Sequence, residues 1–126
     1  MLILVDTDVL IEIFDKNSEK GDAALKKIEE IGEDITLSSL NLHEILFGLY
    51  KYKARGKIDK ILLFDVVEFN KDDANLSAKL EIEAERKGKK ASRFDSMIAA
   101  VAINRGLSLF TFNTSHFKVF KNLTLI

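Results

Sequence analysis

Three acidic residues stand next to apolar segments of the sequence, where an unpaired charge is costly. Asp6 directly follows the apolar run Leu2–Val5. Glu44 lies within an apolar helical pattern, and Asp95 opens the apolar run 96–103. Burying unpaired carboxylates costs several kcal/mol each, so three that converge require a cation. Carboxylate oxygens suit Mg²⁺ or Mn²⁺, and such an ion can activate water for hydrolysis of a phosphodiester.

The elements that must position these acids alternate between strands and helices. Apolar runs predict strands at residues 2–5, 35–38, 66–69, 108–112 and 123–126. Helical spacing predicts helices at about residues 8–14, 18–31, 40–54, 58–62, 70–87 and 94–104, with a break at Arg55–Gly56. This order is typical of an α/β fold with three layers, in which helices cover both faces of a central, mostly parallel sheet. The acids would then lie at the strand-to-helix edge, where such domains place their sites.

Composition limits the remaining function classes. A chain of 126 residues is predicted to form one domain, residues 1–126. Its formal net charge of −1 excludes nucleic-acid binding through overall charge. The absence of cysteine excludes thiolate chemistry, and two histidines do not favour a zinc site, so oxygen ligands are expected. The longest apolar run is too short to span a bilayer and the start is not that of a signal peptide, so we expect a cytoplasmic protein without a membrane partner.

A basic cluster precedes the third acid. It consists of Arg86, Lys87, Lys89, Lys90 and Arg93. Lysine and arginine hold phosphates by charge, so we expect Lys89, Lys90 and Arg93 to guide substrate phosphates toward the acids. A solvated loop without a binding role is the alternative.

Each acid also has a purely structural interpretation. Asp6 or Thr7 could cap the helix that follows. Asn41 and Ser92 each stand three residues before an acid, which is the spacing of a capping box. The sequence leaves this alternative open.

Four motifs resemble the PIN-domain family of metal-dependent ribonucleases, and most closely its VapC-like toxins from toxin–antitoxin pairs. The resemblance covers essentially the whole chain. The motifs, in order, are Val5–Ile11, Leu42–Gly48, Phe94–Ala100 and Leu109–Phe117.

This resemblance implies an endoribonuclease that hydrolyses RNA phosphodiester bonds with Mg²⁺ (or Mn²⁺). It makes Asp6, Glu44 and Asp95 the catalytic acids and metal ligands, and it gives Thr7 a role in setting the first turn. Many family members carry a fourth acid where this chain has Asn113 or His116. A second metal would therefore be held more weakly. Asn113 could instead supply a neutral oxygen or cap a helix.

The resemblance also implies a homodimer and a small antitoxin protein as partner. Residues 40–64 carry more apolar side chains than one core-facing stripe needs, and such a surplus usually marks an interface. These residues are Leu46, Phe47, Leu49, Tyr50, Tyr52, Ile58, Ile61, Leu62, Leu63 and Phe64. A basic residue of the antitoxin would suit the acidic site.

Two other functions remain open from the sequence. The absent fourth acid allows a catalytically weak PIN-like binding module. The segment Asp6–Leu10 after an apolar strand also resembles the nucleophile loop of haloacid-dehalogenase phosphatases, with Asp6 as nucleophile and Asp8 as acid and base. That second alternative lacks a convincing strand-end lysine and a late pair of aspartates.

Overall fold

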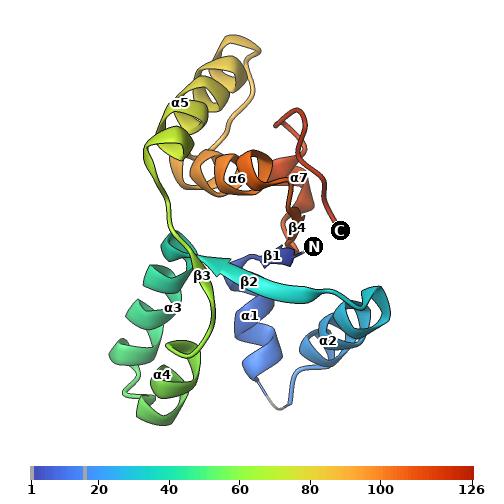
Figure 1. The fold of residues 1–126 in the computed structure, drawn as a ribbon, viewed down its shortest axis with the longest axis vertical. Helices are drawn as coiled ribbons and strands as arrows, with labels where there is room; N and C mark the ends of the chain where they lie inside the picture. The colour runs from blue at the N-terminus through green and yellow to red at the C-terminus, as the bar shows by residue number, and fades with distance from the viewer. Residues whose placement is uncertain (1, 16) are drawn as a thin grey trace.

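A parallel sheet forms the centre of the computed structural model, which describes residues 2–15 and 17–126 (Figure 1). Within these residues it has four strands in the order β3-β2-β1-β4, and every neighbouring pair is parallel. The strands are β1 (Leu2–Val5), β2 (Asp34–Ser38), β3 (Val66–Val67) and β4 (Ser108–Phe110). The prediction of a parallel sheet is confirmed.

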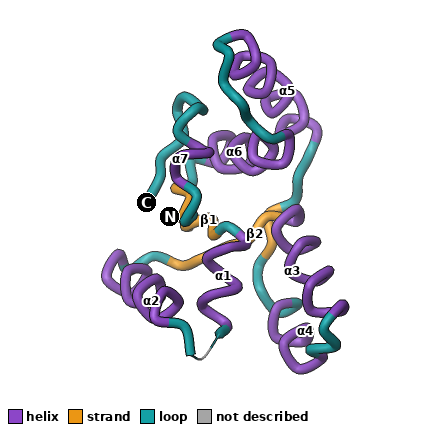
Figure 2. Tube along the Cα trace, turned by 180° about the vertical axis from the view of Figure 1, so that it is seen from behind, coloured by secondary structure: helices purple, strands orange, loops and turns teal. Residues whose placement is uncertain are grey.

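Helices cover both faces of this sheet. They are α1 (Thr7–Phe14), α2 (Glu19–Ile31), α3 (Ser39–Lys51), α4 (Arg55–Ile61), α5 (Lys71–Arg86), α6 (Arg93–Arg105) and α7 (Thr114–Phe117). Helices α1 to α4 lie on one side and α5 to α7 on the other, and the view from behind shows the same separation (Figure 2). The predicted three-layer α/β/α class is therefore confirmed. No helix among the described residues has the length and apolar character needed to cross a membrane.

The central strand β1 divides the core between the two faces. Successive side chains of a strand point to opposite faces. Leu4 accordingly packs with α6 and Phe117, whereas Ile3 and Val5 pack with α1 and Ile28. These three side chains are at most 1% exposed, which explains the uninterrupted apolar run in the sequence. The strand thus fixes the residue that follows it relative to both helical layers.

Several predicted boundaries are wrong for identifiable reasons. Helix α3 ends at Lys51, and the chain turns at Lys53 with a φ of 56° before α4 begins at Arg55. The break therefore precedes Arg55–Gly56. Strand β3 is shorter than predicted because the Phe69 amide donates to Ser39 Oγ at 3.1 Å. The predicted strand 123–126 reduces to a single bridge between Leu109 and Leu125.

Helices α1 and α2 pack too closely to admit a side chain at Gly21. A Cβ atom there would lie 2.0 Å from the Glu12 carbonyl oxygen. The cap of α2 reinforces the contact, because Ser18 Oγ accepts from the Gly21 amide at 3.0 Å and donates to Glu12. This packing holds α1, the first helix after the central strand, against its neighbour.

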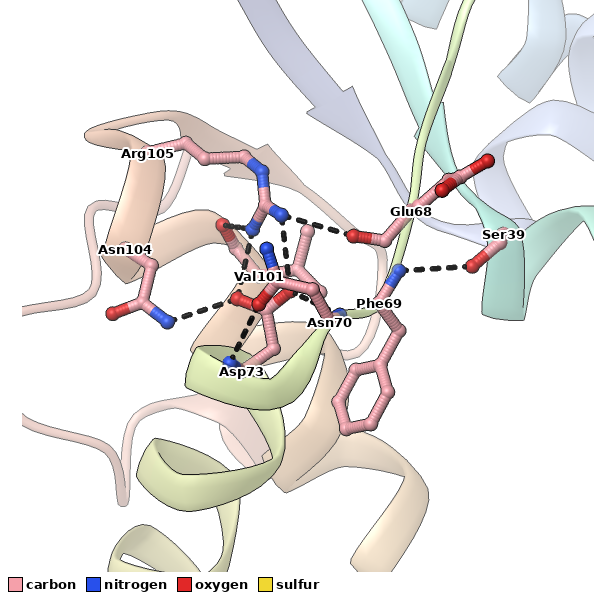
Figure 3. A network of polar contacts seen from close by, with 8 residues as sticks. All are labelled: Ser39, Glu68, Phe69, Asn70, Asp73, Val101, Asn104 and Arg105. Carbon is pink, nitrogen blue, oxygen red and sulfur yellow. Dashed lines mark hydrogen bonds and ion pairs between the residues drawn. The ribbon is translucent and has the colours of Figure 1, made fainter.

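A buried ion pair ties α5 to α6 (Figure 3). Asp73 is 0% exposed, and both of its oxygens accept from Arg105, at 2.8 and 3.0 Å. Asn104 and the Asn70 amide donate to the same carboxylate, at 2.8 and 2.9 Å. Arg105 also donates to the Glu68 carbonyl at 2.9 Å. Burial opposes ionisation of Asp73, but these donors outweigh it and lower its pKa.

We expect Asp73→Ala to lower the free energy of unfolding by about 3 kcal/mol, because Arg105 loses its buried partner. Urea unfolding at pH 7 measures this loss. Asp72→Ala, at an exposed position in the same helical turn, is the control and should cost less than about 1 kcal/mol. Equal losses in the two variants would contradict the role given to the ion pair.

The same variant should show a defined pH dependence. The pKa of folded Asp73 lies below the unfolded value of 3.8, so the stabilisation is complete at neutral pH. It is lost as the pH falls from about 4 toward the folded pKa. The deficit of Asp73→Ala should therefore shrink at pH 3.

Candidate active site

Asp6 stands at the carboxyl end of the central strand, with 8% of the residue exposed. Its backbone amide continues the sheet by donating to the Phe110 carbonyl at 2.9 Å. Its Oδ1 caps α1 by accepting from the Thr7 amide at 2.9 Å. Its Oδ2 accepts from the Thr111 hydroxyl at 2.8 Å, across 105 residues of sequence. The capping interpretation of Asp6 is thus correct, but capping accounts for only one of its contacts.

Asn41 orients the same carboxylate from the first turn of α3. Its side-chain amide donates to Asp6 Oδ1 at 3.1 Å and to Thr7 Oγ1 at 3.0 Å. Ser38 fixes this orientation, because its hydroxyl donates to Asn41 Oδ1 at 2.6 Å. Asn41 is 0% exposed, so its amide must find partners inside the protein.

The alternative in which Asn41 caps a helix in a box with Glu44 is wrong. Ser38 is the cap residue, and its hydroxyl accepts from the Asn41 backbone amide at 3.1 Å. Asn41, Ser38 and Thr111 were therefore missed as parts of the site. The spacing of Ser38 and Asn41 directly after a strand was the available signal.

Thr7 connects the second predicted acid to this network. Its hydroxyl donates to Glu44 Oε1 at 2.7 Å while accepting from Asn41. Glu44 is exposed, so the expectation that it lies buried among apolar residues is wrong. Neighbouring α3 residues such as Ile45 turn into the core, and Glu44 points away from it. Thr7 therefore holds an exposed acid beside the buried one.

Asp95 lies in the first turn of α6. Its backbone amide donates to the hydroxyl of the cap residue Ser92 at 3.0 Å, as the capping spacing predicts. Its side chain is 22% exposed, and His116 Nδ1 lies 3.9 Å from its Oδ2. The structure thus brings His116 next to the third acid.

Asn113 belongs to the turn that follows β4. Its backbone amide donates to Thr111 Oγ1 at 3.1 Å. It occupies the cap position of α7, but its side chain makes no capping hydrogen bond and is exposed. The capping interpretation of this side chain is therefore not supported among the described residues.

Negative charge accumulates around Asp6. Burial raises its pKa, hydrogen bonds from Thr111 and the Thr7 amide partly offset this, and the charge of Asp95 raises it further. Burial and the charge of Asp6 raise the pKa of Asp8 to about 6. Asp8 Oδ1 is buried and has no hydrogen-bond partner among the described residues, while its Oδ2 accepts from the Phe112 backbone amide at 3.2 Å. Repulsion among the acids thus opposes the ionised forms of Asp6 and Asp8.

The donor chemistry of this site fits a hard divalent cation. It consists of carboxylate oxygens whose mutual repulsion a cation would relieve, and such ions keep several water ligands. Across residues 2–15 and 17–126, no group of three or more Asp, Glu or His side chains is already arranged as a metal-binding set. Hydrogen bonds through Asn41 and Thr7 connect Asp6 to Glu44, and electrostatic repulsion acts between Asp6 and Asp95. These described residues do not form a preassembled set of metal ligands.

The basic cluster before Asp95 divides into paired and free charges. Arg93 makes a two-pronged ion pair with Glu81, at 3.1 and 3.2 Å, between α6 and α5. Lys89 and Lys90 lie exposed in the connection between these helices. The pairing makes Arg93 a weaker candidate for phosphate contact than the two lysines.

An apolar groove borders Glu44. It has a volume of about 290 Å³ and its lining includes Ile11, Phe14, Gly48 and Tyr52. A Cβ atom at Gly48 would meet nothing within 4 Å, so this glycine faces open space and does not accommodate another backbone.

The apolar surplus of residues 40–64 divides between core and surface. Ile58 and Ile61 are buried at 6% and 0% exposure. The exposed members are Phe47, Tyr50, Tyr52, Leu62 and Leu63, at 53% to 86%. The remaining three, Leu46, Leu49 and Phe64, are half-buried against the core. The exposed set, here called the α3/α4 surface, is the part available for an interface.

Comparison with known proteins assigns the family. The model of the PIN domain matches residues 3–122, which is nearly the whole chain. The chain belongs to the PIN-domain family. This confirms the resemblance that the four motifs indicated.

Known PIN-domain relatives match the chain along most of its length. The VapC ribonuclease Y4jK of Sinorhizobium fredii is 28% identical, over 93% of this chain and 91% of the relative. The ribonuclease VapC1 of Methanocaldococcus jannaschii is 27% identical, over 98% and 84%. Among solved structures, FitAcB from Neisseria gonorrhoeae covers 100% of this chain and 96% of its own, with a TM-score of 0.85 and 22% identity. The structure of VapBC2 from Rickettsia felis bound to a promoter DNA fragment covers 100% and 98%, with a TM-score of 0.81 and 24% identity.

Replacing Asn41 with leucine, of similar volume, removes the side-chain donor to Asp6 and Thr7. The pKa of Asp6 should rise further, because a hydrogen bond to the charged form is lost. Stability should fall by about 1–3 kcal/mol, since buried polar groups lose their partners. Carboxyl NMR titration in metal-free buffer and urea unfolding measure the two effects.

Asn75→Leu, at an exposed position on α5, is the matched control for the same chemical change. An unchanged Asp6 pKa in Asn41→Leu would show that the amide does not stabilise the ionised acid.

Proposed function

We propose that this chain is a divalent-metal-dependent endoribonuclease of the VapC type. The observation that carries the proposal is the network at the end of β1, in which Asn41 and Thr7 connect Asp6 to Glu44 while Asp95 acts on Asp6 through its charge. Relatives named as ribonucleases, aligned over more than nine-tenths of this chain, support the activity. The haloacid-dehalogenase alternative is not favoured by membership of the PIN family.

Asp6, Glu44 and Asp95 are the residues that would hold Mg²⁺ (or Mn²⁺). When bound, the ion supplies activation of water and neutralisation of charge on the phosphate. Thr111 and Asn41 keep the Asp6 carboxylate in one orientation, and Thr7 does the same for Glu44. The protein thus fixes its acids before the substrate arrives, which is the condition for electrostatic stabilisation of a transition state.

Three further assignments accompany this proposal. Asn113 or His116 stands where a fourth acid would be, and Asn113 would contribute a neutral oxygen, so a second cation would be held weakly. His116 already lies against Asp95. Lys89 and Lys90 are proposed to contact substrate phosphates, and Arg93 to do so only when it leaves Glu81.

Substitution of each acid tests the activity. Asp6→Asn, Glu44→Gln and Asp95→Asn should each reduce cleavage of single-stranded RNA by about 100-fold or more, because each removes a charged ligand of the ion. They should also weaken Mn²⁺ binding in calorimetry. EDTA should abolish cleavage by the parent, and added Mg²⁺ or Mn²⁺ should restore it.

Asp72→Asn, which changes an exposed acid on α5, should retain activity and Mn²⁺ binding. A folded parent that binds Mn²⁺ but does not cut RNA would favour the catalytically weak binding module instead. Parent-like cleavage by all three acid variants would refute the site assignment.

The α3/α4 surface supports two proposed partners, a second copy of the chain and a small antitoxin. Solved relatives include VapBC2 from Rickettsia felis and a toxin–antitoxin complex from Klebsiella pneumoniae. The apolar groove beside Glu44 would suit an apolar segment of an antitoxin that also presents a basic residue to the acids. Such a partner would compete with the metal ion for the carboxylates.

Sedimentation tests the homodimer. The parent should sediment as a dimer at micromolar concentration, and Tyr50→Asp or Leu62→Asp should shift it toward the monomer, because a charge replaces an exposed apolar contact. Ile82→Asp, at an exposed apolar position on α5, is the control and should leave the dimer intact. A monomeric parent would refute the dimer without bearing on the nuclease.

A further inference from the structure

We propose that a second groove, between α2 and the segment after β4, binds a single-stranded stretch of RNA next to the acidic site. This inference rests on the proposed function, since it names the surface on which the substrate would lie. The substrate contacts predicted from the sequence are Lys89, Lys90 and Arg93. None of these lines this groove.

One end of the groove is lined by a residue that is hydrogen-bonded to the buried acid. It has a volume of about 500 Å³ and includes Thr111 in its lining. The Thr111 hydroxyl donates to Asp6 Oδ2 at 2.8 Å. One residue is therefore shared between the groove and the carboxylate that ends β1. A chain lying in the groove would lead directly to the proposed cleavage site.

Phe112 offers an aromatic face in this groove. It is 39% exposed although it is a large apolar residue. Its backbone is held by the bond from its amide to Asp8, and its ring packs edge-to-face against Phe110, with centroids 6.1 Å apart. The ring is thus fixed in place and partly open. Bases stack on such rings without requiring a particular sequence.

Two lysines of α2 supply positive charge along the same groove. Lys20 Nζ lies 5.8 Å from the centre of the Phe112 ring, and Lys27 Nζ lies 5.5 Å from that of Phe110. They are seven residues apart, which is two helical turns or about 10 Å. They would therefore reach different phosphates of one strand. Between them the helix carries Ala23 and Ala24, whose small side chains leave the groove open.

Lys20 lies over the exposed Phe112 ring but is held there only weakly. Neither ammonium forms an ion pair within the described part of the chain. A lysine over an exposed ring is held by about 0.5–1 kcal/mol only. An arriving base would take the face of Phe112, and the flexible Lys20 would move to the adjacent phosphate. Lys20 thus covers the Phe112 ring when no substrate is bound. With substrate, Phe112 would stack on the base and Lys20 would bind the neighbouring phosphate.

The two lysines and the Phe112 ring together favour RNA over an acidic peptide as the ligand of this groove. Two cations alone would suit either ligand. An exposed aromatic ring beside Lys20 suits a base. The acids next to Thr111 would repel a peptide carboxylate but would hold a cation for a phosphodiester.

Fluorescence anisotropy with a labelled ten-nucleotide RNA of mixed sequence, in EDTA to prevent cleavage, tests the groove. Phe112→Leu should weaken binding by about 10-fold because stacking is lost, and Phe112→Tyr should retain parent affinity because the ring remains. Lys20→Gln and Lys27→Gln should each flatten the slope of log K against log salt by about 0.7. Lys26→Gln, the same change one residue away and outside the groove lining, is the matched control.

Two results would overturn the proposal. One is parent-like affinity in Phe112→Leu together with equal salt slopes for Lys27→Gln and Lys26→Gln. The other is equal competition by polyglutamate in the parent and in Phe112→Leu, which would make the groove a site for acidic peptides. Cleavage assays run in parallel separate this inference from the nuclease itself. If the parent cleaves RNA but the substitutions leave RNA binding unchanged, only the groove proposal is refuted. If the parent does not cleave RNA but the substitutions weaken binding as expected, only the nuclease proposal is refuted.

Discussion

The buried carboxylate of Asp6 is the constraint on which the site depends. Because it ends the central strand, its position is fixed by both halves of the core, through Leu4 on one face and Ile3 and Val5 on the other. A carboxylate that is 8% exposed must be surrounded by donors, and Thr7, Asn41 and Thr111 provide them from three separate segments. Satisfying one buried charge thus assembles the ends of β1, β2 and β4 into a single structure.

Local patterns in the sequence were sufficient for most of the fold. The uninterrupted apolar run of β1 and the alternation of strands and helices predicted a parallel sheet between helical layers. Short-range signals also predicted a helix that begins at about residue 70, and Asn70 is its N-cap, in a capping box with Asp73. Strand ends were less predictable, because they depend on contacts with distant residues. Phe69 leaves the sheet to bind Ser39, which no local pattern at residues 66–69 encodes.

The candidate site was predictable in its charged members and in Thr7, but not in its other neutral members. An acid next to an apolar run is a local signal in the sequence, so Asp6 and Asp95 were predicted from their immediate neighbours. Asn41 and Thr111 are neutral, and their importance comes from partners 35 and 105 residues away from them. Glu44 shows the opposite limitation, because its helical neighbourhood suggested burial while the rotation of α3 places it outside the core. Which face of a helix is covered depends on its neighbours in space.

Glu44 belongs to two surfaces at once. It accepts the hydroxyl hydrogen bond of Thr7 within the acidic network, and it also lines the apolar groove beside Tyr52. A cation among the acids and a molecule in the groove would therefore act on one shared side chain. Thermodynamic linkage then makes their effects reciprocal, so that each changes the affinity for the other by the same factor. Binding at one surface would change the affinity at the other even if the backbone did not move.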